Sequence, residues 1–184
     1  MEEPKRSLLD NFCISFCNIV EKHTPYIIVS GFVAISSGRA RATEDIDMII
    51  PYVKEDNFIK LHKDLVKKGF VCRQSDNPKE IYEYLKEKLS VRYTYKNKML
   101  PEMEIKFAKD ELDDYQLKTR IKLDLTGLDV WFSSVNMNVA FKEEYLKSPK
   151  DMEDARHLRI VYGELIDEDE INRIKRLIRE KRLK

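Results

Sequence analysis

The stretch VSGFVAISSGRARATEDIDMII, residues 29–50, decides the fold. A buried strand leads into Gly31 and a short helix, and the apolar run 45–51 then predicts a second strand that a proline closes. Two acids interrupt that run. Because side chains alternate along a strand, Asp45 and Asp47 project from one face and the aliphatic residues between and after them from the other. The second strand is therefore predicted to carry a carboxylate pair opposite a core-forming face.

Two carboxylates this close together need a positive charge between them. They stand two residues, or about 7 Å, apart along the strand and repel one another without a cation. Mg²⁺ prefers carboxylate and phosphate oxygens, so the pair suits metal-assisted phosphoryl transfer, although an isolated pair is more often a solvated rim. The preceding residues favour the metal. The turn at Ser30 and Gly31 would let backbone N–H groups approach a phosphate, and Arg39 and Arg41 could meet a triphosphate.

Residues 27–50 resemble the signature of the nucleotidyltransferase superfamily, whose fold is shared with DNA polymerase beta. The most similar members are small prokaryotic ones, the minimal and the toxin-type nucleotidyltransferases. The resemblance implies that Asp45 and Asp47 bind two Mg²⁺ ions. It also implies a nucleotide-binding set, which consists of Ser30, Gly31, Arg39, Arg41 and Thr43. The chain departs from the family at Ser30-Gly31, where Gly-Gly or Gly-Ser is usual.

The resemblance further implies a third metal-binding and catalytic carboxylate on a later strand. Glu104 in EMEIKFA, residues 102–108, stands between two apolar residues as that position requires, although the family more often has Asp there. Asp124 and Asp129 are the alternatives, because both fall in segments with strand-like alternation. For all three acids, a solvated strand face is the non-functional interpretation.

The segment YLKSPKDMEDARHL, residues 145–158, resembles a helix start found downstream in the toxin-like members. This resemblance implies that Lys147 and Lys150 neutralise triphosphate charge. Asp151 and Asp154 would orient those lysines, or Asp151 would simply favour the helix N-terminus.

The rest of the pattern predicts an α/β (α+β) fold, a mixed sheet flanked by helices. Strands are expected at 70–74 and in two hairpins that pair 90–97 with 102–108 and 120–125 with 128–134. Further helices are expected over 6–22, 54–68, 78–88, 149–162 and from 167 onward. We predict a single nucleotidyltransferase-like domain over 1–184, with a sheet-containing core over 1–134 and a C-terminal helical part over 135–184.

The composition is that of a globular protein. The 184 residues are 42% hydrophobic and carry a formal net charge of +1, which argues against disorder and against a global basic field for nucleic acid. The three cysteines form no CxxC pair and the three histidines are scattered, so no zinc site is predicted. The sequence has neither a signal-peptide pattern nor an apolar run of membrane-spanning length, so we expect a cytoplasmic protein without a membrane partner.

Three functional hypotheses fit these features. The first is a Mg²⁺-dependent enzyme that moves a nucleoside monophosphate from a nucleoside triphosphate, ATP or another, to a hydroxyl of an RNA, a protein or a small molecule. The second is a catalytically inactive module that kept the fold and binds a nucleotide or a partner. The third is the toxin of a toxin–antitoxin pair, which would modify transfer RNA and bind an antitoxin.

Overall fold

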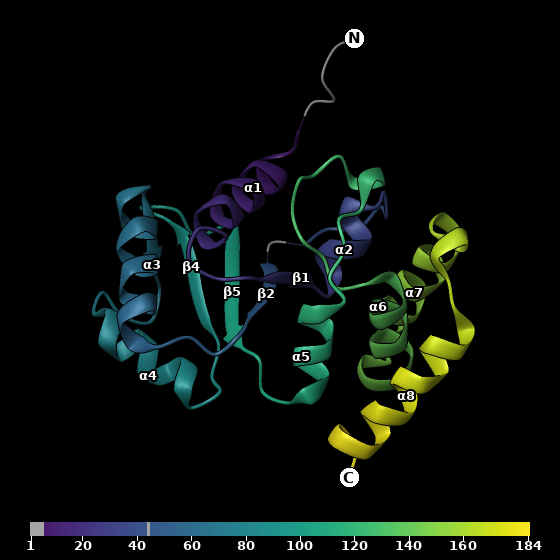
Figure 1. The fold of residues 1–184 in the computed structure, drawn as a ribbon. Helices are drawn as coiled ribbons and strands as arrows, with labels where there is room; N and C mark the ends of the chain where they lie inside the picture. Colours follow the sequence, from purple (N-terminus) through teal and green to yellow (C-terminus); the bar gives the residue numbers. More distant parts are fainter. Residues whose placement is uncertain (1–5, 44) are drawn as a thin grey trace.

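A five-stranded mixed sheet organises the protein, which a computed structural model describes over residues 6–43 and 45–184 (Figure 1). Its order is β1-β2-β5-β4-β3. The central pair β2·β5 is parallel and the other pairs are antiparallel, as the prediction of a mixed sheet requires. The strands are β1 (Ile27–Val29), β2 (Asp45–Ile50), β3 (Phe70–Cys72), β4 (Val91–Tyr95) and β5 (Glu102–Phe107).

The two faces of the sheet differ in polarity because side chains alternate. One face is apolar and is covered by three helices, α1 (Leu8–Val20), α3 (Glu55–Lys67) and α4 (Pro78–Lys86). The rings of Phe16 in α1 and Tyr93 in β4, for example, have centroids 5.6 Å apart. The opposite face carries the acids of β2 and β5. Burial of the first face therefore fixes which side chains the second face displays.

Helix-capping residues start the main helices where the sequence predicts them. The Ser7 hydroxyl accepts a hydrogen bond from the backbone N–H of Asp10 at the start of α1. The side-chain oxygen of Asn77 accepts one from the backbone N–H of Lys79 at the start of α4. Ser148 and Asp167 do the same for α7 (Pro149–Val161) and α8 (Glu168–Arg182).

The C-terminal helices stand beside the β1 edge of the sheet, where Figure 1 shows α6, α7 and α8 grouped together. The chain first forms α5 (Glu111–Lys118), then α6 (Val135–Phe141), which continues into a π-helical turn over Lys142–Leu146. The short helix α2 (Gly31–Ser36) packs against α7 and so joins the helical group to the sheet. The sequence interpretation missed α5, although the Asp110 carboxylate caps it by accepting from two backbone N–H groups.

The prediction of a hairpin over 120–134 is wrong. Only Ile121 and Phe132 pair across it, in one antiparallel bridge, and Phe132 also bridges Ile28 at the free edge of β1. Asp124–Thr126 form a 3-10 turn that Gly127 ends at φ 65°. The strand-like pattern arises because alternate apolar side chains are buried, but the two halves of the predicted hairpin form backbone hydrogen bonds only between Ile121 and Phe132.

In the described part of the chain, no helix combines the length and the apolar character that crossing a bilayer requires.

Candidate active site

Four acidic residues align on the open face of β2 and β5. The parallel register aligns Asp45 with Glu102 and Asp47 with Glu104. Arg92 of β4 lies opposite Glu104 on its other side. The two aspartates therefore share one face as predicted, and Glu104 is the next residue across the sheet from Asp47.

The carboxylates raise one another's proton affinity. Burial raises the pKa of Asp47, and the negative charge of Glu104 adds to this rise, while Lys106 and a hydrogen bond from the Ser30 hydroxyl oppose it. Burial also raises the pKa of Asp45, reinforced by the charge of Glu102. Such a row of acidic side chains, whose charge neighbouring cations offset only in part, fits a hard divalent cation.

Two arginines form ion pairs with Glu102 and Glu104 and so offset their negative charge. Arg92 Nη2 lies 3.0 Å from Glu104 Oε2, and Arg73 forms an ion pair with Glu102. Within residues 6–43 and 45–184, no three His, Cys, Asp or Glu side chains are grouped so that they could hold a metal ion. The metal-ligand role of Glu104 stays a prediction, and it requires the carboxylate to turn away from Arg92.

The alternative third acids lie elsewhere. Asp124 begins the 3-10 turn, and the Asp129 side chain is 86% exposed in an ion pair with Lys122. The segment that carries them adjoins the outer edge of β1, whereas Asp45 and Asp47 are on β2. The structure thus brings Glu104, and neither rival, to the strand beside the aspartate pair.

A cavity of about 250 Å³ opens beside Asp47. Its floor is the open face of the sheet, including Ser30 and Lys106, and its wall is formed by α5, α6, the π-helical turn and α8. Asp47 therefore stands at the edge of a space between the sheet and the C-terminal helices.

Ser30 has a backbone conformation that glycine adopts far more readily, with φ 67° and ψ −139°. It joins β1 to α2, and its side chain lowers the pKa of Asp47. Strain is thus concentrated one residue from the glycine of the turn and directly beside the acidic pair.

Replacing Ser30 separates this strain from the hydroxyl contact. Ser30→Ala removes the hydroxyl that lowers the pKa of Asp47 and keeps the strain, whereas Ser30→Gly removes both. We expect Ser30→Gly to be more stable than Ser30→Ala by about 1 kcal/mol, within the usual cost of such a backbone conformation. Urea denaturation of the two variants measures the difference, and equal stabilities would show that the conformation stores no strain.

Gly31 allows the Arg41 guanidinium to lie against the turn. A Cβ at position 31 would collide with Arg41 Nη2, whereas one at Gly163 would meet nothing within 4 Å. The buried Asp154 carboxylate holds the Arg41 guanidinium at 2.6 Å, so the arginine cannot move aside without loosening that ion pair. We therefore expect Gly31→Ala to lower the free energy of unfolding by about 1–3 kcal/mol. Gly163→Ala is the matched control in the same thermal or urea titration, and a loss no larger than the control's would contradict the assignment.

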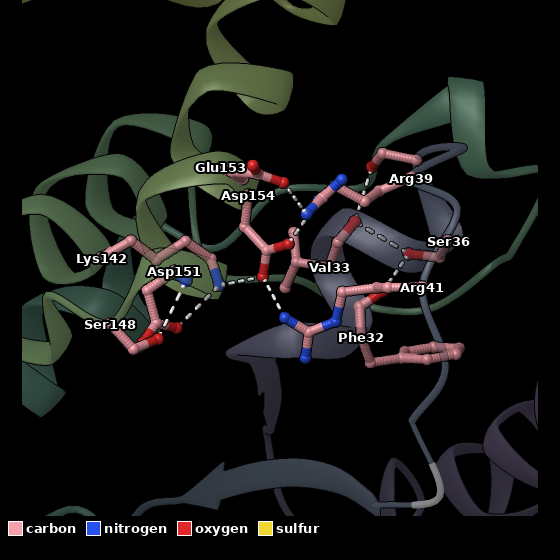
Figure 2. A network of polar contacts seen from close by, with 11 residues as sticks. Phe32, Val33, Ser36, Arg39, Arg41, Lys142, Ser148, Asp151, Glu153 and Asp154 are labelled. Carbon is pink, nitrogen blue, oxygen red and sulfur yellow. Dashed lines mark hydrogen bonds and ion pairs between the residues drawn. The ribbon is translucent and has the colours of Figure 1, made fainter.

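Figure 2 shows the buried network that holds the two predicted arginines. The Asp154 side chain is 0% exposed and accepts from Arg39 Nε at 2.9 Å, Arg41 Nη1 at 2.6 Å and Lys142 Nζ at 3.0 Å. Arg39 also pairs with Glu153. The network ties the loop before β2 to α7 and the π-helical turn, so both arginines have a structural partner in addition to any phosphate.

The predicted lysines lie away from this network. Lys147 is half exposed and 3.8 Å from Glu144, and Lys150 is exposed in the first turn of α7. Asp154 orients Lys142 and the arginines rather than these lysines, and Asp151 accepts a hydrogen bond from the Ser148 hydroxyl at the helix start. Thr43 donates to the carbonyl of Asp45, at 3.1 Å.

Lys142 is the residue that sequence reasoning missed. Its side chain is 1% exposed, bonds Asp154 and lines the cavity. Its spacing of four residues from Asn138 and three from Val139 puts it on the buried side of α6, which is the signal that could have found it.

Two solved structures align with nearly the whole chain. An antigenic nucleotidyltransferase-like protein from Paracoccidioides brasiliensis covers 95% of this chain and 88% of its own, at 17% identity and a TM-score of 0.55. The chain has the nucleotidyltransferase fold. The antibiotic-resistance factor ANT(2'')-Ia shares this fold, with 12% identity, a TM-score of 0.53 and 94% of each chain covered. No family model and no curated protein matches the sequence. The nucleotidyltransferase resemblance of residues 27–50 is therefore confirmed at the level of the fold.

Proposed function

We propose that this chain is a Mg²⁺-dependent nucleotidyltransferase, which moves a nucleoside monophosphate from a nucleoside triphosphate to a hydroxyl acceptor. The observation that carries the proposal is the pairing of Asp45 and Asp47 on the open face of β2, beside a cavity in a nucleotidyltransferase fold. The raised pKa of each aspartate reflects burial and the negative charge of neighbouring glutamates, which a cation would offset.

Each acid has a role in this proposal. Asp45 and Asp47 supply the carboxylate oxygens that hold Mg²⁺, with Glu104 as the third ligand once it leaves Arg92. When bound, the metal neutralises phosphate charge and polarises the reacting phosphoryl group. The acceptor oxygen forms a bond to the α-phosphorus while the bond from that phosphorus to the β-phosphate oxygen breaks, which releases pyrophosphate. In this proposal Glu104 would take the proton from the acceptor hydroxyl.

The turn at Ser30 and Gly31 is proposed to hold the triphosphate. Arg41 supports this assignment, because its guanidinium lies against Gly31 and its buried Nε has no hydrogen-bond partner among the described residues. A phosphate oxygen would satisfy that atom. Arg39 is engaged by Asp154 and Glu153 and would position Arg41's loop, while Lys147 and Lys150 would contribute only at longer range.

The acceptor is proposed as a class, a hydroxyl on an RNA, a protein or a small molecule. The small-molecule option gains support because one structural neighbour is described as an antibiotic-resistance factor. The toxin option, with transfer RNA as acceptor and an antitoxin as partner, rests on the resemblance of residues 27–50 and 145–158.

A label-transfer assay tests the proposal. The protein is incubated with nucleoside triphosphates labelled at the α-phosphate, Mg²⁺, and separate pools of cell RNA, cell protein and hydroxyl-bearing antibiotics. We expect transfer of the α-label with release of pyrophosphate, and complete loss of transfer when EDTA removes the metal. Transfer of a γ-label would indicate a kinase instead. Triphosphate binding without any transfer would favour the inactive binding module.

A further inference from the structure

The helical wall of the cavity carries charges that are already paired. Lys142 Nζ lies 3.0 Å from Asp154 Oδ2. Arg182 Nη2 lies 2.9 Å from Asp110 Oδ1 and 2.8 Å from Asp113 Oδ1. Arg41 differs from these two cations, because its buried Nε has no hydrogen-bond partner among the described residues. A triphosphate gains little binding energy from cations whose buried nitrogens already have carboxylate partners. This wall therefore suits an uncharged part of a ligand.

Aromatic rings form part of the same wall. Phe141 and Tyr145 both line the cavity, with centroids 6.1 Å apart and ring planes at 80°. The Arg182 guanidinium carbon lies 5.1 Å from the centre of the Phe141 ring and 5.9 Å from that of Tyr145. Aromatic side chains and a guanidinium plane are the surfaces on which proteins stack nucleobases.

Asn138 presents a hydrogen-bond acceptor from this wall. Asn138 is 4% exposed, and its side-chain amide nitrogen donates to the backbone carbonyls of Ser133 and Ser134 at 2.9 and 3.0 Å. Only the NH₂ group can serve two carbonyls, so these contacts fix the orientation of the carboxamide. Its Oδ1 has no partner among the described residues and is the atom that Asn138 offers to the cavity.

Gln116 lines the same wall and presents a donor. Its amide nitrogen donates one hydrogen to Asp113 Oδ1 at 3.1 Å, and its Oε1 accepts from the Ser133 hydroxyl at 2.9 Å. The second hydrogen of the amide stays available. Because Ser133 bonds both carboxamides, the free acceptor of Asn138 and the free donor of Gln116 lie on one wall.

The size of the cavity suits part of a nucleotide. A volume of about 250 Å³ greatly exceeds the roughly 10–15 Å³ that a single water occupies by this measure. It is below the 300–1,000 Å³ that is usual for complete ligand pockets. A ring system fits, and the phosphates would remain outside, toward Asp47 and the Ser30 turn.

We propose that this cavity is the nucleobase pocket, and that it selects a base with an amino group at ring position 4 or 6, adenine or cytosine. The inference rests on the proposed function. The base stacks on Tyr145, its amino group donates to Asn138 Oδ1, and a neighbouring ring nitrogen accepts from Gln116. An acceptor beside a donor is the carboxamide pattern that proteins use to read adenine. Uracil and hypoxanthine present a carbonyl oxygen where Asn138 needs a donor.

Matched nucleotide pairs test the selection. Binding of ATP and ITP, and of CTP and UTP, to the full chain is measured by titration calorimetry with Mg²⁺ and no acceptor. We expect at least one amino-bearing nucleotide to bind about tenfold more tightly than its deaminated counterpart, because the mismatch leaves Asn138 without a donor. Equal affinities within both pairs would overturn the nucleobase assignment and leave the proposed function intact. Absence of binding by every triphosphate would overturn both.

Variants of Tyr145 test the stacking surface. Tyr145→Ala is expected to weaken binding of the preferred nucleotide about tenfold, and Tyr145→Phe to restore it to within about twofold, because the ring supplies the contact. Tyr84→Ala, which alters a tyrosine of similar exposure on α4, is the control and should not change affinity. A loss of affinity with Tyr145→Phe equal to that with Tyr145→Ala would contradict stacking. So would unchanged affinity of a Tyr145→Ala protein whose melting temperature matches the parent's.

Discussion

Asp45→Asn combined with Asp47→Asn is expected to reduce transfer of an α-labelled nucleotide about 10³-fold or more. The carboxylate charges hold the metal in the proposed mechanism, and loss of a metal's transition-state stabilisation amounts to several kcal/mol. Asparagine keeps the side-chain shape, so the loss measures charge and metal affinity rather than packing. The measurement is the initial rate of label transfer at saturating Mg²⁺, and transfer that survives in the double variant would exclude this mechanism.

Asp47→Asn alone is expected to stabilise the fold while it lowers activity. The raised pKa of Asp47 means that the folded state binds its proton more tightly than the unfolded state does. The free energy of unfolding contributed by this group therefore falls as pH rises from the ordinary value of 3.8 through the raised folded pKa. Asp47→Asn should remove that decline and raise the melting temperature at neutral pH.

A surface control separates this effect from a general one. Asp129→Asn alters an exposed carboxylate and should change neither the pH profile of stability nor label transfer. If Asp47→Asn melted below the parent protein at neutral pH, the assignment of a destabilising charge at this position would be wrong. A parent melting temperature that rises with Mg²⁺ while the variant's stays constant would further support metal binding.

Asp154→Ala is expected to lower the free energy of unfolding by about 3–5 kcal/mol, the largest stability effect that we predict. The substitution leaves Arg39, Arg41 and Lys142 without the buried carboxylate that all three share. Water can reach Arg39 more easily than Lys142, so the buried lysine should account for much of the cost. Urea denaturation at neutral pH measures the change.

Asp129→Ala is the matched control for this experiment, since it removes one aspartate from an exposed ion pair. It should cost no more than about 1 kcal/mol. A loss of similar size in both variants would mean that the Asp154 network contributes no more than a surface pair. In that case the coupling of α7 to the Gly31 turn would also need another explanation.

The strand–turn–helix–strand unit of residues 29–50 was predictable because it is local. Strand, turn, helix and strand follow one another within residues 29–50, and the alternation of Asp45 and Asp47 with buried neighbours depends only on strand geometry. Glu104 could be nominated for a related reason, since EMEIKFA alternates cleanly. The strand-like pattern of residues 120–134 led to the wrong prediction of a hairpin, because buried and exposed side chains alternate there although the segment has no partner strand.

The partners of the charged residues could not be predicted from local pattern. Arg39 and Arg41 look like phosphate ligands in the sequence, yet both contact Asp154, more than 110 residues away. Glu104 aligns with Asp47 only through the register of β2 with β5, and Arg92 reaches it from β4. Each of these contacts depends on which distant segments the core brings together.

Short-range rules thus account for the carboxylate pair, the glycine turn and the helix caps, because strand alternation and capping act over a few residues. Packing of the C-terminal helices against the open face produced the cavity, the burial of Lys142 and the paired charges of its wall. Burial makes an ionic partner obligatory, and the partner can come from anywhere in the chain. The positions of the acidic side chains on β2 therefore follow from residues close by in the sequence, whereas the shape and charge of the pocket follow from long-range contacts.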